Sequence, residues 1–335
     1  MCQVVHTMDY VIQAKKLSKS FITRQTFPGI WGAIKSLCFS KKQEIPAIKE
    51  ISFSIKPGER VAFIGSNGAG KSTTIKMLTG ILHPSSGSIE VLGLVPWKNR
   101  HALGYKIGTV FGQRTQLWHH LPPSDTFDLL AKIYEIDRPT YESRLKELLD
   151  VFEIEPFFHK PVRQLSLGER MRCELVASLL HRPEILFLDE PTIGLDINAK
   201  LKIRGLLNRL SKEYRITLFL TSHDTADIEQ VCERVIILDQ GSIILDSTLK
   251  ELKKTYVKKK ILTLTTDEEH FLLDLAGVKV LENTNHHFVC EVNIETVSID
   301  RVIQETLKKT SLKDVTIEDP SMEEIIRTLY GTAHV

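Results

Sequence analysis

This 335-residue chain lacks several features that mark membrane, secreted or metal-binding proteins. No apolar run in it approaches the roughly 20 residues that a membrane-spanning helix needs. Residues 1–17 lack the apolar stretch of a signal peptide. The five cysteines are scattered without a CxxC pair, which argues against a disulfide framework or a zinc site. We therefore expect a protein of the reducing cytosol.

The chain also has little excess charge of either sign. Its 44 Lys and Arg residues oppose 42 Asp and Glu residues, which leaves a formal net charge of +2. Such a balance provides no broad basic face, so we expect no nucleic-acid partner. The composition, 42% hydrophobic and 26% charged, is that of a folded globular protein. The length is enough for two domains.

One stretch fits the phosphate-binding pattern G-x-x-x-x-G-K-[ST]: Gly65, Ser66, Asn67, Gly68, Ala69, Gly70, Lys71, Ser72 and Thr73. Residues 60–64 before it are mostly apolar, as in a buried strand, and residues 72–80 after it have apolar residues at helical spacing. Glycines let several backbone N–H groups turn toward one anion, and the helix N-terminus adds its positive end. We predict that Lys71 reaches the β- and γ-phosphates of a nucleotide and that Ser72 binds Mg²⁺.

Short apolar segments alternate with helical ones along the rest of the first 249 residues. We predict strands at residues 10–17, 47–55, 88–92, 106–110, 185–188, 216–221 and 235–238. Helical patterns cover residues 124–158 and the segment that ends near residue 180. The strand at 185–188 is apolar without alternation, as expected when helices cover both faces of a sheet. The fold class is therefore α/β, a P-loop fold with a parallel sheet flanked by helices.

Residues 22–46 form an insert between the first two predicted strands. Phe27, Ile30, Trp31, Ile34 and Leu37 recur in it at roughly helical spacing, with basic residues around them. We expect a short amphipathic helix that contacts the membrane or a membrane partner. Packing of the insert on its own domain is the alternative.

The composition changes near residue 250. Residues 250–260 are rich in lysine and predict a solvated linker. Beyond it we predict strand 261–266, helix 270–276, strands 278–282 and 287–292 as a hairpin, helix 299–309, strand 315–318 and helix 321–329. The order β-α-β-β-α-β is typical of a small ferredoxin-like domain. We therefore divide the chain into domains at residues 1–249 and 261–335.

A second group of polar residues follows the later apolar strands. Asp189 ends strand 185–188, which we place beside the phosphate-binding strand, where a carboxylate commonly holds Mg²⁺. Glu190 should point the other way along the pleat, toward the γ-phosphate. His223 follows the next strand, and its position favours a phosphate contact. Two surface acids and a structural histidine are the alternatives, which the run from Pro191 to Asp196 makes weaker.

These motifs in series resemble the ATP-binding subunit of an ABC transporter over residues 10–249. Residues 65–73 match its Walker A motif and residues 185–190 its Walker B motif. Asp196 matches the D-loop, His223 the switch histidine and Gln113 the Q-loop glutamine, for which Gln116 is the rival. Phe21 stands where the family has its adenine-stacking aromatic. The signature motif is similar to Leu165, Ser166, Leu167, Gly168 and Glu169, with Leu167 where glycine is commoner and Glu169 where glutamine is.

The resemblance implies an ATPase domain with an antiparallel β lobe and a helical lobe. Two such domains, in a homodimer or with a paired ATPase subunit, sandwich two ATP molecules, each lying under the partner's signature motif. Ser72, Asp189 and Gln113 would hold Mg²⁺, and Glu190 would activate water with support from His223 and Gln113. Separate polytopic permease subunits would keep the protein at the cytoplasmic side of the membrane, as a peripheral subunit.

Residues 320–325 resemble the C-terminal extension of ABC-2-type exporter ATPases, which points to export. A polysaccharide or lipid-linked glycan exporter shares the same motifs and is the second possibility. A soluble ABC ATPase of translation or DNA maintenance is a third, but such proteins carry two motif sets or a long coiled coil. The transported substrate is not readable from the chain, because its contacts belong to the membrane partner.

Overall fold

The computed structural model describes residues 9–24, 42–112, 114–256, 259–268, 273–284 and 286–333. The chain divides into two compact units, residues 1–247 and 248–335. This division lies close to the predicted end of the first domain at residue 249.

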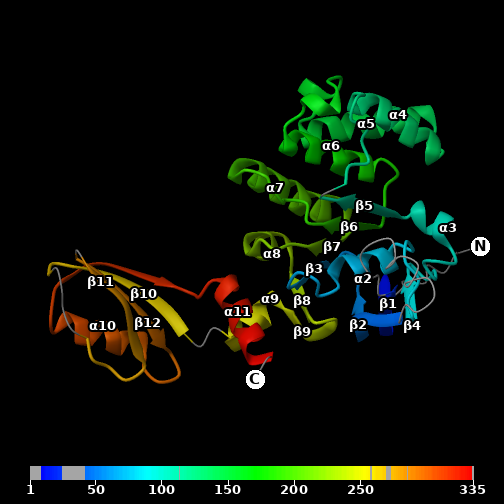
Figure 1. The fold of residues 1–335 in the computed structure, drawn as a ribbon. Coiled ribbons are helices and arrows are strands. Elements are labelled where there is room, and N and C mark those ends of the chain that lie inside the picture. Colours follow the sequence, from blue (N-terminus) through cyan, green and yellow to red (C-terminus); the bar gives the residue numbers. More distant parts are fainter. Residues whose placement is uncertain are drawn as a thin grey trace, which may run out of the picture. The chain divides into compact units, whose positions relative to one another are not determined.

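The first unit combines two sheets with helices (Figure 1). Its strands are β1 (Ile12–Arg24), β2 (Lys42–Ile55), β3 (Arg60–Gly65), β4 (Ser86–Val91), β5 (Ile107–Phe111), β6 (Ile185–Asp189), β7 (Thr217–Thr221), β8 (Arg234–Asp239) and β9 (Ser242–Thr248). Its helices are α2 (Lys71–Leu78), α3 (Arg100–Gly104), α4 (Pro123–Ile133), α5 (Arg138–Phe152), η1 (Glu155–Phe157), η2 (Val162–Gln164), α6 (Leu167–Leu179), α7 (Ile197–Tyr214) and α8 (Thr225–Val231).

The larger sheet has the strand order β5-β6-β7-β3-β8-β9. The pairs β5–β6, β6–β7, β7–β3 and β3–β8 are all parallel, which confirms the predicted parallel sheet. β7 lies between β3 and β6, so the prediction that Asp189 sits on a strand beside the phosphate-binding strand was wrong by one strand. β9, which the sequence pattern did not predict, follows β8 through a tight turn at Gln240 and Gly241.

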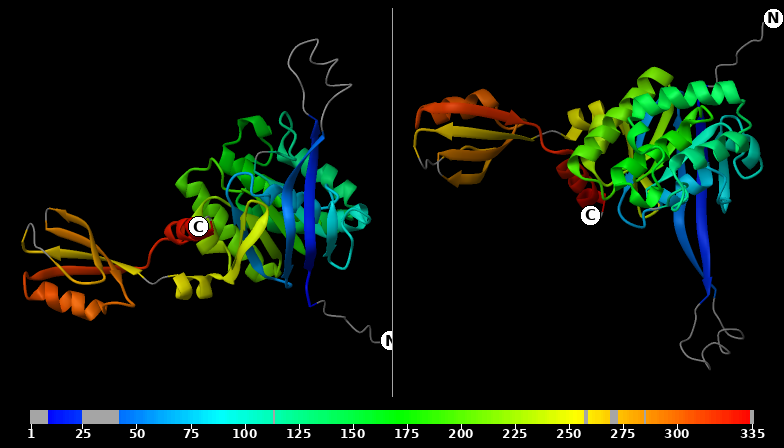
Figure 2. Two further views of the ribbon diagram at one scale, coloured as in Figure 1. Left: turned by 60° about the horizontal axis from the view of Figure 1, so that its bottom comes forward. Right: turned by 90° about the horizontal axis from the view of Figure 1, so that it is seen from above.

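The smaller sheet has the order β2-β1-β4 and is antiparallel, as the resemblance implied. β1 does not end at Leu17, as predicted, because it continues to pair with β2 as far as Arg24 opposite Lys42. The two strands extend together from the rest of the unit (Figure 2). The ends of the insert, residues 22–24 and 42–46, are therefore strand. The helix predicted from Phe27 to Leu37 lies outside the described residues.

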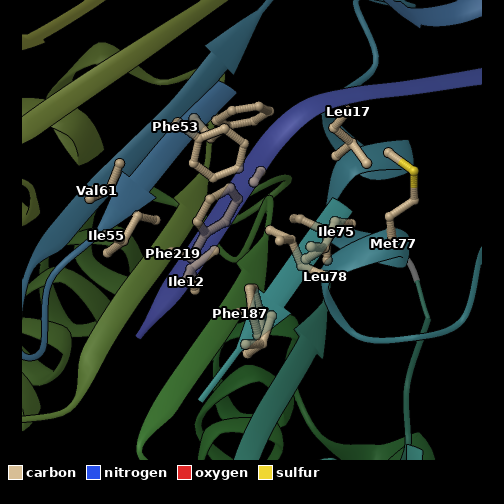
Figure 3. Close-up of a cluster of buried hydrophobic side chains, with 14 of the residues drawn as sticks. Ile12, Leu17, Phe53, Ile55, Val61, Ile75, Met77, Leu78, Phe187 and Phe219 are labelled. Atoms are coloured by element: carbon tan, nitrogen blue, oxygen red, sulfur yellow. The ribbon is translucent and has the colours of Figure 1, made fainter. Parts of the chain in front are cut away.

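The main core of the first unit lies between the two sheets and α2 (Figure 3). Phe53 from the antiparallel sheet meets Phe63 and Phe219 from the parallel sheet, with ring centroids 5.7 and 6.4 Å from that of Phe53. Ile75 and Leu78 pack into the same core from α2 and are fully buried. Burial of these apolar side chains fixes the strand that precedes the phosphate loop and the helix that follows it.

The helical pattern predicted over residues 124–158 is present as α4, α5 and η1. The helix is interrupted after α4 because Asp137 caps the N-terminus of a new helix, α5: its side chain accepts a hydrogen bond from the backbone N–H of Thr140 at 3.0 Å. Together with α6 these elements form the helical lobe.

The second unit contains α9 (Leu249–Tyr256), β10 (Lys259–Thr266), β11 (Val278–Thr284), β12 (His287–Asn293), α10 (Ile299–Leu307), β13 (Leu312–Glu318) and α11 (Met322–Ala333). Its antiparallel sheet has the order β11-β12-β10-β13, which is the order that a ferredoxin-like chain gives. The buried side chains of this sheet include Leu262, Leu264, Phe288 and Cys290.

Two predictions for this second unit need correction. Residues 250–256 of the predicted linker are the helix α9, in which Leu252 is buried. The described part of the helix predicted at 270–276, residues 273–276, is not helical, and the remainder lies outside the described residues. The hairpin predicted over 278–292 is confirmed, with Thr284 paired to His287.

Candidate functional site

The predicted phosphate loop connects β3 to α2, as its motif requires. Gly68 and Gly70 adopt φ values of 82° and 108°, which side chains other than glycine rarely tolerate. A Cβ atom on Gly65 would lie 2.6 Å from the carbonyl oxygen of Leu238, and one on Gly70 would lie 2.7 Å from that of Ala47. The loop therefore needs glycine both for its backbone conformation and for close packing.

The loop forms a hollow of about 400 Å³, which we call the phosphate-loop hollow. It is lined by Ala47, Asn67, Gly68, Ala69, Gly70, Lys71, Ser72, Thr73, Glu190, Ile193 and His223. The structure thus brings Glu190 and His223, which follow β6 and β7, to the residues of the loop. The carboxyl ends of these parallel strands meet at one edge of the sheet, which is where α/β proteins bind their ligands.

Lys71 is the buried cation of this hollow, with only 7% of the residue exposed. Its Nζ donates to the carbonyl oxygens of Gly65 at 2.7 Å and Ser66 at 3.3 Å, and lies 3.4 Å from Nε2 of His223. Burial lowers the pKa of Lys71, while the charges of Glu190 and Asp189 act in the opposite direction. A phosphate beside Nζ would supply the negative charge that a buried ammonium favours.

Ser72 and Asp189 form the group that fits a magnesium ion. The Ser72 hydroxyl donates to Oδ2 of Asp189 at 3.0 Å, and the hydroxyl of Thr221 donates to Oδ1 at 2.6 Å. A hydroxyl and a carboxylate beside a phosphate site are oxygen ligands of the kind that Mg²⁺ takes. Within the described residues there is no cluster of three or more His, Cys, Asp or Glu side chains that could hold a metal by themselves. An ion here would need phosphate or water oxygens as further ligands.

The backbone conformation that directs the Glu190 side chain into the hollow differs from the one predicted. β6 ends at Asp189, and Glu190 adopts a φ of 58°, so a left-handed turn rather than the strand pleat directs its side chain. Its backbone N–H donates to the carbonyl oxygen of Thr221 at 3.0 Å, which holds this conformation. Burial raises the pKa of the Glu190 carboxyl, and His223 and Lys71 partly offset that effect.

His223 and Glu190 contact each other at the edge of the hollow. Nε2 of His223 lies 3.1 Å from Oε1 of Glu190, within ion-pair distance although without the geometry of a hydrogen bond. The backbone N–H of His223 donates to Oε2 at 3.3 Å. The two side chains are therefore placed to act on the same atom or water molecule.

Three signature residues, Ser166, Gly168 and Glu169, line a second hollow of about 320 Å³ together with Asp196, and we call it the signature hollow. Leu165 and Leu167 do not line it. Ser166 is the N-cap residue of α6 and forms a capping box with Glu169: the Glu169 N–H donates to the Ser166 hydroxyl at 3.2 Å, and the Ser166 N–H donates to Oε2 of Glu169 at 2.8 Å. Asp196 is the N-cap residue of α7, and its side chain accepts a hydrogen bond from the backbone N–H of Ala199. The two hollows share no lining residue.

Two further predicted residues need separate mention. Gln113 lies outside the described residues, so its predicted role stays a prediction. Its rival Gln116 uses its side-chain amide to donate to the carbonyl oxygen of Glu174 at 3.1 Å, so this group is engaged in the helical lobe. Phe21 is 39% exposed and lies opposite Ile45 on the hairpin of β1 and β2, without lining the hollow.

The prediction that Phe21 stacks on adenine can be tested directly. Aromatic stacking contributes about 1 kcal/mol, so Phe21→Ala should weaken ATP binding roughly fivefold while the melting temperature changes little. Ile22→Ala is the matched control, because adjacent strand residues point to opposite faces and Ile22 is 68% exposed. Equal affinities of the two variants would reject the stacking role, and a collapse in the melting temperature of Phe21→Ala alone would assign Phe21 to the core.

Sequence reasoning missed the residues that hold the loops after β6 and β7 together. Asp227 in α8 is 1% exposed and accepts hydrogen bonds from the hydroxyls of Thr192 and Ser222, the latter at 2.6 Å. Arg204 of α7 donates to the same carboxylate at 2.6 Å. This buried group fixes Thr192, which follows Glu190, to Ser222, which precedes His223. No motif marks Asp227 or Arg204 in the sequence.

A larger hollow, of about 470 Å³, lies at the opposite edge of the parallel sheet. Its lining includes Gly58 before β3, Ile216 before β7 and the ion pair of Arg144 with Glu147. None of the predicted motif residues lines it. Size therefore does not identify the site, and the convergence of polar groups at the phosphate-loop hollow does.

Comparison with known proteins agrees with this geometry. Residues 48–193 match the ABC transporter family, and residues 248–328 match the family described as ATP-binding protein DrrA1-3-like, C-terminal domain. The chain is 31% identical over 212 residues to the ABC transporter ATP-binding protein NatA of Bacillus subtilis (strain 168), which covers 63% of this chain and 86% of that protein. It is 30% identical over 292 residues to the linearmycin resistance ATP-binding protein LnrL of the same organism, covering 85% and 93%.

Solved structures show the same likeness. The ATP-binding subunit of an ABC transporter aligns with a TM-score of 0.60 at 26% identity, covering 73% of this chain and 93% of that one. A dimeric ATP-binding cassette in a post-hydrolysis state, bound to ADP and Pi, aligns with a TM-score of 0.58 at 26% identity, covering 71% and 98%.

The fold and the two hollows define a P-loop ATPase of the ABC class. The chain belongs to the ATP-binding subunits of ABC transporters, in the ABC-2 exporter-type branch. In the part of the chain that the structure describes, no helix combines the length and the apolar character needed to cross a membrane.

Proposed function

We propose that this chain works as one of two ATPase subunits that close around two MgATP molecules and thereby drive a separate, membrane-spanning exporter. The observation that carries the proposal is that the phosphate-loop hollow and the signature hollow share no lining residue. Each hollow offers only part of a site for a nucleotide. A second ATPase subunit facing the first would complete both sites.

In the phosphate-loop hollow, the chain's own residues position and neutralise the nucleotide. Lys71 and the backbone N–H groups of the loop would bind the β- and γ-phosphates, and Ser72 and Asp189 would hold Mg²⁺. The ion neutralises charge that develops on the phosphate oxygens. Glu190 would orient and deprotonate the attacking water, while His223 would contact the γ-phosphate and that water. Gln113 would contribute to the metal site.

In the signature hollow, Ser166 and Gly168 would serve the partner's ATP. They lie at the N-terminus of α6, where a hydroxyl, backbone N–H groups and the helix dipole favour an anion. Glu169 would support Ser166 through the capping box, and Leu165 and Leu167 would flank it. Asp196 at the start of α7 lines the same hollow and would face the partner subunit.

Export is the direction that the relatives support. The relative LnrL is named for linearmycin resistance, and a relative from Bacillus licheniformis, 34% identical over 208 residues and covering 62% of this chain and 67% of that protein, is the bacitracin transport ATP-binding protein BcrA. The match of residues 248–328 to a DrrA1-3-like C-terminal domain favours this branch over a glycan exporter. Polytopic permease subunits would hold the ATPase at the cytoplasmic side of the membrane, and a domain division near residue 249 would leave the second unit as an accessory domain.

A complementation experiment tests whether the sites are shared between subunits. Lys71→Ala should inactivate the phosphate-loop hollow, and Ser166→Arg should block the signature hollow. Each variant alone should hydrolyse almost no ATP. In a mixture, half of the dimers pair the two variants and contain one intact site, so about a quarter of the wild-type activity should return.

A mixture that stays as inactive as its components would contradict the shared-site proposal. The partner is tested separately, by purifying the tagged chain from membranes of its native host. We expect a polytopic membrane protein to co-purify with it. Recovery of active ATPase without any membrane protein would favour a soluble role.

A further inference from the structure

Glu174 is a buried carboxylate in the middle of α6 that the mechanism above does not use. Only 4% of the residue is exposed, and its neighbours Cys173, Leu175 and Val176 are buried apolar side chains. No ion pair joins it to a cation among the residues that the structure describes. Burial raises the pKa of Glu174, whereas the hydrogen bonds that it accepts act in the opposite direction. An apolar residue at this position would avoid the cost of burying the carboxylate.

Among the described residues, the hydrogen bonds that the Glu174 carboxylate accepts come from one segment, residues 115–117. The hydroxyl of Thr115 donates to Oε1, and the backbone N–H of Gln116 donates to Oε1 at 3.2 Å and to Oε2 at 3.3 Å. In return, the side-chain amide of Gln116 donates to the backbone carbonyl oxygen of Glu174 at 3.1 Å. Both the side chain and the backbone of Glu174 thus hold this segment against α6.

Residues 115–117 connect β5 of the parallel sheet to the helical lobe. They follow β5 and Gln113, and they lead into the helical lobe, where the Trp118 N–H donates to the hydroxyl of Thr126 in α4 at 3.5 Å. Glu174 itself lies eight residues after Ser166, roughly 12 Å along the helix axis. One side chain therefore ties the segment beyond Gln113 to the helix whose first residues form the signature hollow.

We propose that Glu174 is a positioning residue that makes residues 115–117 and the signature helix α6 move as one body. When the state of the subunit's own nucleotide changes, residues 115–117, which follow Gln113, would move and take α6 with them. Ser166 and Gly168, which would serve the partner's nucleotide, would thereby change position. This inference rests on the proposed function. Its test must distinguish a positioning role of Glu174 from a simple contribution to the stability of the fold.

Three variants distinguish these two roles of Glu174. Glu174→Ala removes the acceptors of Thr115 and Gln116. Glu174→Gln keeps one acceptor oxygen, and in the wild type Oε1 alone accepts from both donors. Ser178→Ala is the matched control, because Ser178 is 2% exposed in the same helix but donates only to the carbonyl oxygen of Leu175 within it.

We expect Glu174→Ala to bind MgATP within about twofold of the wild type and to lose about tenfold or more in kcat, because displacement of catalytic groups by about an ångström has effects of this size. Glu174→Gln should recover most of the loss, and Ser178→Ala should retain the wild-type kcat. All assays are run well below the melting temperature of each variant. A kcat of Glu174→Ala within twofold of the wild type, an equal loss in Ser178→Ala, or no recovery with glutamine would overturn the inference.

A local readout keeps the test independent of the proposed function. With Trp31 and Trp97 replaced by phenylalanine, acrylamide quenching reports on Trp118 alone. Release of the segment in Glu174→Ala should increase the quenching constant of Trp118, whereas Ser178→Ala should leave it unchanged. Absence of ATP hydrolysis by the wild type would reject the proposed function. Independently of that result, equal quenching constants of Trp118 in Glu174→Ala and Ser178→Ala would reject the positioning role of Glu174.

Discussion

Glu190→Gln is expected to bind MgATP normally but to hydrolyse it at least about 10²-fold more slowly, the range for a lost general base. Glutamine keeps the size of the side chain but removes the charge that activates water. Lys71, Ser72 and Asp189 remain to hold the nucleotide and its ion. Since bound ATP would contact both subunits only when they are closed, blocked hydrolysis should shift the population toward a closed dimer. Size-exclusion chromatography with MgATP should show a stable dimer for the variant and mainly monomer for the wild type.

The control for this experiment is Glu184→Gln. Glu184 lies just before β6, at the opposite end of the same strand, and pairs with Lys106 at 3.2 Å on the surface. Its loss should affect neither hydrolysis nor dimerisation, because exposed ion pairs contribute little. Hydrolysis by Glu190→Gln at the wild-type rate would reject both the catalytic role of Glu190 and the shared-site mechanism that depends on it.

The phosphate loop could be predicted from the sequence because all its determinants are local. The glycines, Lys71 and Ser72 fall within nine residues, and the strand and helix around them have clear apolar patterns. The capping box at Ser166 and Glu169 is local as well, since its two partners are three residues apart, although it was not among our predictions. In such motifs, residues close in sequence determine the conformation once the flanking strand and helix form.

The residues that support the site could not be predicted, because their partners are distant in sequence. Thr221 reaches Asp189 across 32 positions, Asp227 reaches Thr192 across 35, and Glu174 reaches Thr115 across 59. The strand order decides which of these residues meet, and the sequence pattern does not determine that order. For the same reason the sequence pattern does not reveal that β7 lies between β6 and β3.

Local composition misled the prediction at two element boundaries. The polar run Ser18–Ser20 predicts that the first strand ends at Leu17, yet pairing with β2 extends β1 to Arg24. Lysines in residues 250–260 suggested a linker, but Leu249 and Leu252 are buried on one side of α9. In both places long-range pairing or packing outweighs the local polar signal.

Lys71→Ala is expected to weaken MgATP binding about 10- to 100-fold, the effect of losing a hydrogen bond to a charged group worth roughly 1.5–3 kcal/mol. The ammonium is already buried against the carbonyl oxygens of Gly65 and Ser66, so little of its hydration remains to be lost when phosphate binds. In such surroundings the attraction to phosphate is stronger than at an exposed surface. Equilibrium binding of a fluorescent ATP analogue measures the change.

Lys76→Ala provides the matched control, because it removes the same group from the same helix without touching the phosphate-loop hollow. Its affinity for MgATP should equal that of the wild type. Melting temperatures of both variants are needed, because Lys71 also bonds the loop backbone and its loss leaves two carbonyl oxygens without that donor. If Lys71→Ala remains folded and binds MgATP within about twofold of the wild type, the lysine does not contact phosphate. The loop glycines would then be a structural turn rather than a nucleotide site.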